Sequence, residues 1–335
     1  MTAIVESLNF DALHNRSERM GFFTRARKIS GWLAFRLQQQ GVSFACVRRP
    51  PSALPVLEAV GYATGPRPSH AELLERLAKE QHASRYECSN LLAADEYQIL
   101  SVDAPNVAPD ELKTAIRWRL KDMLDYRVDD ATVDVLDIPV DKNAPARNHQ
   151  MYAIAARNQM IEDRQKLFET ARVPLRVIDI PEMAQRNIAA LLEPEARGLA
   201  MLSFSDEGGL LTITHEGELF LSRRIDVSAD QLADDSPDAR QRAYDRVTLE
   251  LQRSLDHFDR QYHYVTMSSL MLAPLATSAS ELRDYLSSNL YLPVEHVALD
   301  KILDLSAVPA LRSASEQQRH FLTIGAALRH EEKAL

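Results

Sequence analysis

The chain has 335 residues, which is long enough for two domains or one domain of two lobes, because single cores stop growing near ~250–300 residues. Its hydrophobic content of 45% and charged content of 26% are globular averages, which excludes a disordered, collagen-like or rod-like architecture. With 39 basic and 48 acidic side chains the net charge is -9, so we expect no nucleic-acid partner.

Cysteine usage and the first residues indicate where the chain resides. Cys46 and Cys88 are too few for a disulfide framework, and too few for a Cys-based zinc site unless histidines complete it. No run of 18 apolar residues occurs, and the first 30 residues contain the acids Glu6, Asp11 and Glu18. We therefore expect neither a transmembrane helix nor a signal peptide, and a protein that stays in the reducing compartment where it is made.

Glycine is scarce. The chain has ten glycines, where average usage of ~7% would give roughly 23, and none lies between Gly65 and Gly198. Because phosphate-binding loops need small residues, this shortage disfavours such loops.

Residues 1–30 show weak periodicity and end in a basic cluster of Arg25, Arg27 and Lys28. We interpret them as a flexible N-terminal arm. The cluster fits a solvated tail, and the alternative is contact with anionic lipid headgroups.

The first ordered unit begins with two apolar runs that a short Gln-Gly turn joins into a hairpin, 31–37 and 41–47. A third strand is expected at 55–63. A helix is expected from the N-cap Ser69 to about His82, because Leu73, Leu74 and Leu77 form one stripe, and a strand follows at 86–92.

The middle of the chain alternates strands and helices in the order βαββαβ, which is typical of a ferredoxin-like module. Its expected elements are a strand at 96–103, a helix that starts at 109–111, strands at 132–138 and 151–156, a helix over Ile161 to Ala171, and a strand at 175–180.

The last third of the chain repeats the order of expected elements seen in the first third. Its expected elements are strands at 198–204, 209–215 and 217–225, a helix at 237–262, a strand at 264–272, a helix at 279–289, a short strand at 293–294 and a helix at 317–329. Three strands, a helix and a strand thus occur twice, at 31–92 and 198–272, which predicts two similar lobes.

No catalytic motif is present. The sequence lacks GxGxxG, GxxxxGK[ST], GxSxG and HExxH, and the nearest histidine pair, His257 and His263, stands six residues apart, which does not place both rings on one helix face. We expect no catalytic residue and no metal site.

Two turns could face phosphate if a nucleotide lay between the lobes. The first, 37–41, offers glutamines and one glycine. The second contains small and acidic residues, and we expect its acid, Asp206, two or three residues past the strand end; its candidate residues are Ser203, Ser205, Asp206, Gly208 and Gly209. An ordinary acidic hairpin loop is the alternative interpretation.

An ordered series of segments resembles the PilM-like proteins of type IV pilus assembly, and among them the MshI proteins of the mannose-sensitive haemagglutinin (MSHA) pilus. The resemblance covers about 31–329. Its segments are GWLAFRLQQQGVSFACVRR, YECSNLL, EYQILSVDAP, ELKTAIRWRLKDMLDYRVDDATVDVLDIP, MYAIAARNQMIEDRQKLFETARVPLRVIDIPE, LELQRSLDHFDRQYH and FLTIGAALR.

The resemblance implies an α/β, actin-like (FtsA-like) two-lobed fold with an inserted βαββα-type subdomain. The implied parts are the arm at 1–30, lobe 1 at 31–100 and 176–197, an inserted ferredoxin-like or SHS2-like subdomain at 101–175, and lobe 2 at 198–330.

The resemblance also implies a function: a non-catalytic cytoplasmic adaptor at the inner-membrane face. Such a protein docks the N-terminal tail of a PilN-like inner-membrane protein and associates with the membrane through that partner. It links this partner to the assembly machinery, including the pilus assembly ATPase. The implied groove lies between lobe 1 and the inserted subdomain, so the candidate contacts are Asn90, Leu91, Arg117 and Trp118. For Trp118 the alternative is packing against the sheet edge.

The sequence departs from the family where the family holds ATP. The first Asp-x-Gly turn falls on Phe35-Arg36-Leu37, the second on Ser203-Phe204-Ser205, and the Gly-Gly adenosine turn on Ala273-Pro274. We therefore expect a degenerate site and no cofactor. Weak Mg-ATP binding, or an ATP switch or ATPase that uses Asp206 and Gly208, is the alternative. A further alternative is the cytoplasmic domain of a GspL-like type II secretion protein. The lack of a transmembrane segment after residue 330 argues against that alternative.

Overall fold

A computed structural model describes residues 30–140, 149–277 and 279–330. The predicted N-terminal arm with its basic cluster lies outside the described residues, as does most of the charged loop before residue 149.

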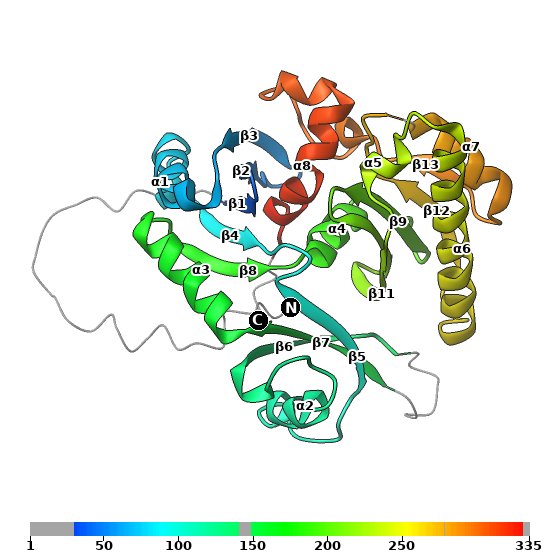
Figure 1. Cartoon of the computed structure of the whole chain (residues 1–335), viewed down its shortest axis with the longest axis horizontal. Coiled ribbons are helices and arrows are strands. Elements are labelled where there is room, and N and C mark those ends of the chain that lie inside the picture. The colour runs from blue at the N-terminus through cyan, green and yellow to red at the C-terminus, as the bar shows by residue number, and fades with distance from the viewer. Residues whose placement is uncertain (1–29, 141–148, 278, 331–335) are drawn as a thin grey trace, which may run out of the picture.

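Two five-stranded sheets with the same strand order form the two lobes (Figure 1). In each, three antiparallel strands are followed by two parallel ones. Lobe 1 has the order β3-β2-β1-β4-β8, with β1 Gly31–Gln38, β2 Gly41–Arg48, β3 Val56–Thr64, β4 Glu87–Leu91 and β8 Leu175–Asp179. Lobe 2 has the order β11-β10-β9-β12-β13, with β9 Gly198–Ser205, β10 Gly208–His215, β11 Glu218–Ile225, β12 Met267–Leu272 and β13 Val294–His296. This duplication confirms the expected actin-like fold.

Helices cover both faces of each sheet, which explains why the central strands are apolar along their whole length rather than alternating. The outer helices are α1 His70–Glu80 and α3 Asn158–Thr170 on lobe 1, with α6 Pro237–Gln261 and α7 Ala279–Asn289 on lobe 2. Two helices pack between the sheets, α4 Pro181–Ala189 and α8 Ala314–Ala327, and a short α5, Ala229–Leu232, precedes α6. Neither α4 nor α5 is among the elements expected from the sequence.

The inserted subdomain lies below the lobes in Figure 1 and consists of β5 Tyr97–Asp103, α2 Leu112–Leu120, β6 Ala131–Asp137 and β7 Gln150–Arg157. Its sheet has the order β5-β7-β6, and α2 buries Ile116 and Leu120 against it. With α3, which follows β7 and packs on lobe 1, these elements keep the expected βαββα order along the chain. A ferredoxin-like sheet is not formed, however, because the next strand, β8, pairs with β4 of lobe 1. The limits predicted for the arm, the two lobes and the inserted subdomain stay predictions.

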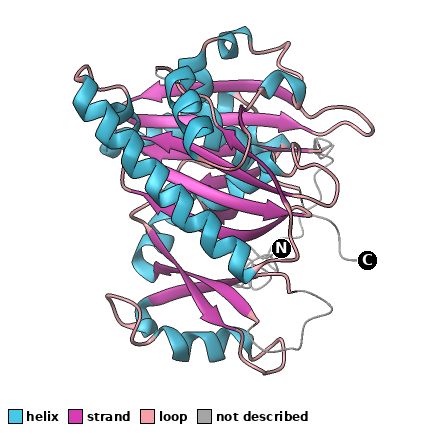
Figure 2. Cartoon of the chain, turned by 90° about the vertical axis from the view of Figure 1, so that its right-hand side faces the viewer, coloured by secondary structure: helices cyan, strands magenta, loops and turns pink. Residues whose placement is uncertain are grey.

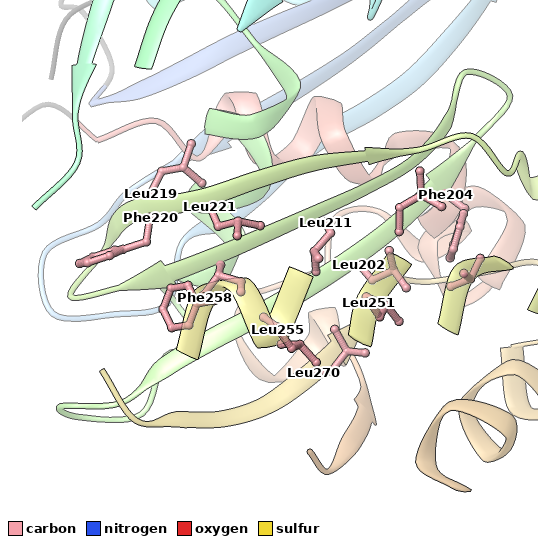
Figure 3. Packing of buried hydrophobic residues seen from close by; sticks show 14 of the residues in the cluster. Leu202, Phe204, Leu211, Leu219, Phe220, Leu221, Leu251, Leu255, Phe258 and Leu270 are labelled. Atoms are coloured by element: carbon pink, nitrogen blue, oxygen red, sulfur yellow. The ribbon is translucent and has the colours of Figure 1, made fainter. Parts of the chain in front are cut away.

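The core of lobe 2 shows how one long helix is held on a sheet. Ser236 caps α6 by accepting the N–H of Ala239 at 3.4 Å. Leu251, Leu255 and Phe258 then follow at helical spacing and pack on the sheet, as Figure 3 shows, and Figure 2 shows the helix crossing that face. Complete burial of each such side chain stabilises the fold by about 1.5–3 kcal/mol.

The helices α4 and α8 approach closely between the lobes. A Cβ at Gly325 of α8 would lie 2.2 Å from the carbonyl oxygen of Ala184 on α4, so only glycine fits there. Asn187 donates a 3.0 Å hydrogen bond to the carbonyl of Gly325. Although α8 belongs to the segment predicted as lobe 2, it packs on β1 and β2 of lobe 1 and thereby joins the lobes.

No helix within the described ranges is both long and apolar enough to span a membrane. Cys46 and Cys88 are both buried.

Candidate functional site between the lobes

The first predicted phosphate turn is a tight hairpin in lobe 1. Gln38 pairs with Gly41, so only two residues connect β1 to β2. The family's Asp-x-Gly position, Phe35-Arg36-Leu37, lies inside β1 rather than in the turn. The side chain of Arg36 is only 4% exposed, which is rare for arginine unless the charge is paired.

The second predicted turn is the matching hairpin of lobe 2. Ser205 pairs with Gly208, so Asp206 directly follows the strand, not two or three residues later as expected. The Ser205 hydroxyl accepts the N–H of Glu207 at 3.1 Å. Gly208 has φ 114°, and a Cβ at Gly209 would lie 2.7 Å from the Phe204 ring. Both glycines therefore serve the hairpin itself.

An ion pair, here called the interlobe ion pair, joins the two hairpins. Arg36 Nη2 of lobe 1 lies 2.8 Å from Glu207 Oε1 of lobe 2, whose side chain is 29% exposed. The other oxygen, Glu207 Oε2, accepts the backbone N–H of Ala94 at 3.1 Å. A guanidinium and a backbone N–H are the groups that bind phosphate in other proteins, and here the protein's own carboxylate occupies both.

Little space remains on the nucleotide side of this pair. A cavity of about 20 Å³ is lined by Arg36, Ser203, Pro274 and Phe321, among others. That volume holds about one water, whereas a pocket for a ligand of nucleotide size is on the order of 300–1,000 Å³. Phe321 of α8 and Pro274 after β12 fill the region predicted to face adenosine.

The hydroxyl of Ser203 is committed to a buried polar network under this cavity. It donates to Gln185 Oε1 of α4 at 2.5 Å. Gln185 Nε2 in turn donates to the carbonyl of Met201 at 2.8 Å and to Thr212 Oγ1 at 2.9 Å. Ser203 and Ser205 thus have structural partners. Asp206, the acid among the predicted loop residues, is exposed.

Asn90 and Leu91, predicted as partner contacts, are fully buried. Asn90 donates to the carbonyl of Phe35 at 3.0 Å and accepts from Arg164 at 2.6 Å. Leu91 packs in the cluster between the sheets. The physical reason is that β4 is a central strand covered on both faces, so these two side chains belong to the interior and not to a surface.

The other two predicted contacts lie on α2. Arg117 donates to the carbonyls of Ala131 and Val128 at 2.7 and 2.8 Å, which fastens α2 to the start of β6. Trp118 is 73% exposed, so it does not pack against the sheet edge. An exposed tryptophan of this kind is a typical binding anchor.

A polar triad centred on a buried carboxylate links the inserted subdomain to both lobes. Glu182 of α4 is completely buried and accepts hydrogen bonds from Tyr97 of β5 and, at 3.1 Å, from Arg224 of β11. Burial, and next the charge of Glu182, hold the pKa of Tyr97 well above its usual value.

Within the described ranges no group of three or more His, Cys, Asp or Glu side chains could hold a metal ion.

Sequence reasoning missed the interlobe ion pair. The signal that could have revealed it is Arg36 itself, a charge inside the otherwise apolar run GWLAFRL. A buried arginine needs an acid nearby. Periodicity cannot say which acid, because Glu207 is 171 residues away.

Comparison with known proteins places the fold. No family model and no curated protein matches the chain. A chain of the PilM-PilN type IV pilus biogenesis complex matches with TM-score 0.68 and 18% identity, over 90% of this chain and 98% of that one. The cytoplasmic domain of EpsL, an inner-membrane component of the type II secretion system of Vibrio cholerae, matches with TM-score 0.42 and 17% identity, over 62% and 76%. A Bacteroides thetaiotaomicron protein described as having an actin-like ATPase fold matches with TM-score 0.48 and 11% identity, over 87% and 99%.

Proposed function

We propose that the chain is a non-catalytic adaptor of type IV pilus assembly that docks the N-terminal cytoplasmic tail of a PilN-like inner-membrane protein. The observation that carries this proposal is the similarity of fold to a chain of the PilM-PilN complex, which extends over 90% of this chain and 98% of that one. The adaptor acts at the cytoplasmic face of the inner membrane, held there by its partner, and connects it to the assembly ATPase. More specifically, we propose that the pilus it serves is of the MSHA type.

The absence of catalysis is proposed from the interlobe site. The interlobe ion pair fills the phosphate side with the carboxylate of Glu207, and the cavity beside it is only about 20 Å³. Neither predicted phosphate turn has a glycine free for phosphate. A Cβ at Gly41 would lie 2.3 Å from the carbonyl oxygen of Ala63, and Gly208 and Gly209 are required by their own hairpin. The fold then acts as a scaffold rather than as an ATPase.

Trp118 is our candidate anchor for the partner's tail. It is the most exposed of the large apolar side chains in the described residues, and Arg117 holds the helix that presents it. A disordered tail that folds onto such an anchor binds with modest affinity and is readily released.

The docking proposal is tested by calorimetric titration of the full chain with a synthetic PilN-like cytoplasmic tail. We expect Trp118→Ala to weaken binding at least tenfold. Tyr291→Ala is the matched control, because Tyr291 is also exposed, at 60%, but lies after α7 on lobe 2. Failure of the wild-type chain to bind the tail contradicts the adaptor proposal, and an equal loss with both variants contradicts the role of Trp118.

The scaffold proposal is tested by titration with Mg-ATP. We expect no binding tighter than about 100 μM, which corresponds to about 5.5 kcal/mol. Tighter binding that Asp206→Ala abolishes would restore the alternative, an ATP-binding switch.

A further inference from the structure

A large cavity lies at the opposite end of lobe 1 from the phosphate turns. It has a volume of about 780 Å³, and its walls are the start of β1, the loop from β2 to β3, and residues 301–302 and 329–330 of the last segments. We call it the basal groove. None of its lining residues belongs to the inserted subdomain, so it is separate from the surface that carries Trp118.

The basal groove lies where two distant parts of the chain are joined. Leu57 donates its N–H to the carbonyl of Asp304 at 3.0 Å, and Asp304 donates its N–H to the carbonyl of Pro55 at 2.9 Å. These bonds attach the start of β3 to the segment that follows β13. The walls are thus held in place by backbone hydrogen bonds, and a ligand finds a preformed site.

The surface of the basal groove is largely apolar. Trp32 and Ile302 form part of the wall, and Leu54 at the rim is 48% exposed. The guanidinium of Arg329 lies over the Trp32 ring at 5.6 Å from its centroid. A concave apolar surface of this volume with an exposed leucine at its rim is typical of a binding site for apolar side chains.

The charges of the lining complement an acidic ligand. The lining contains three basic side chains, Arg49, Lys301 and Arg329, and one acid, Glu87. The whole chain, by contrast, has a net charge of -9. Arg329 is neutralised by Asp179 at 2.9 Å. Among the described residues neither Arg49 nor Lys301 has an ion-pair partner, and Arg49 uses one nitrogen to donate to the carbonyl of Leu328.

The charge changes sign beyond the rim. On the far side of Leu54 a second cavity, of about 490 Å³, is bordered by Asp300 and Asp304. A bound segment would therefore be oriented, with its acidic end toward Arg49 and Lys301.

We propose that the basal groove is a second docking surface, which binds a segment of a partner protein that carries apolar side chains next to carboxylates. The apolar side chains enter beside Trp32 and Leu54, and a carboxylate approaches Lys301. This proposal does not depend on the adaptor function, because it follows from the groove alone.

The test selects peptides from random dodecapeptides displayed on phage, with the immobilised full chain as the target. The enriched sequences are then synthesised with a fluorophore and titrated by anisotropy. We expect them to share apolar residues beside Asp or Glu. We also expect Leu54→Ser and Lys301→Glu each to weaken binding at least tenfold, and higher salt to weaken it further.

Two control variants are matched in exposure. Leu249→Ser changes a leucine that is 44% exposed on α6, and Lys121→Glu changes an exposed lysine after α2. Both should bind the selected peptides within twofold of wild type. The proposal is overturned if enriched peptides are basic, or if they bind the Leu54 and Lys301 variants as well as wild type. It is also overturned if no groove-dependent peptide is enriched, the result expected when residues 1–29 or a second copy cover the groove.

Discussion

Removal of the Glu207 carboxylate tests the interlobe ion pair. Glu207→Ala leaves the guanidinium of Arg36, which is 4% exposed, without its 2.8 Å partner, and it removes the acceptor of the Ala94 N–H. Breaking a fully buried ion pair costs ~3–5 kcal/mol. Because the Glu207 side chain is 29% exposed, water reaches the pair, and we expect a loss of about 1–3 kcal/mol in the free energy of unfolding.

The assay is urea unfolding at pH 7, followed by fluorescence of the buried Trp32. Asp206→Ala is the matched control, because this neighbouring acid is exposed in the same turn, and it should change stability by less than about 0.5 kcal/mol. Glu207→Gln keeps an acceptor for Ala94 and should lose less than the alanine variant.

A double-mutant cycle separates the pair from its surroundings. In Arg36→Met/Glu207→Ala no unpaired charge is left. The double variant should therefore lose about 1–2 kcal/mol less free energy of unfolding than the two single variants lose together. The reasoning is refuted if the cycle is additive, or if Glu207→Ala costs no more than Asp206→Ala.

Three further changes probe the packing around this site. Gly325→Ala places a methyl carbon 2.2 Å from a backbone oxygen of α4 and should destabilise the protein by roughly 1–3 kcal/mol in urea unfolding; no loss would contradict the close approach of α4 and α8. Phe258→Ala empties the fully buried centre of lobe 2 and should cost about 3–5 kcal/mol in the same assay, and a loss below 1 kcal/mol would contradict the packing. His320 is buried, with Nδ1 3.0 Å from the Ser43 hydroxyl and Nε2 3.4 Å from Glu316, and burial lowers its pKa below the ordinary value of 6.5. The unfolded chain therefore binds more protons below pH 6.5, so stability is complete above that pH and falls as the pH decreases. His320→Gln should reduce the loss measured between pH 7.5 and 5.5, and an unchanged pH profile would count against this role.

Element types in the two lobes were predictable because the local pattern and the tertiary environment agree. Gly31–Gln38 and Gly41–Arg48 are continuous apolar runs joined by a polar pair, and they fold as the predicted hairpin. The helix α4 was not predictable in the same way. Its residues Glu182, Gln185 and Asn187 are polar but buried, because each bonds to a distant partner, and helical periodicity cannot reveal such burial.

The middle of the chain shows the same limit for topology. The βαββαβ order is correct as a list of elements, yet it does not state which strands share a sheet. Pairing β8 with β4 rather than with β5 depends on contacts about 87 residues apart in the sequence, Cys88 with Leu175. Asn90 and Leu91 were placed on a surface for the same reason: the sequence does not show that β4 is a central strand.

Length, apolar periodicity and the repeated order of elements determined by themselves that the chain has two similar lobes, and the shortage of glycine disfavoured classical phosphate loops. Both are local or compositional properties, so one sequence suffices. Only the tertiary structure decided what replaces those loops. The carboxylate of Glu207 reaches Arg36 from the other lobe, and Phe321 of the last helix fills the adjacent space, because folding brings together groups that no local pattern connects.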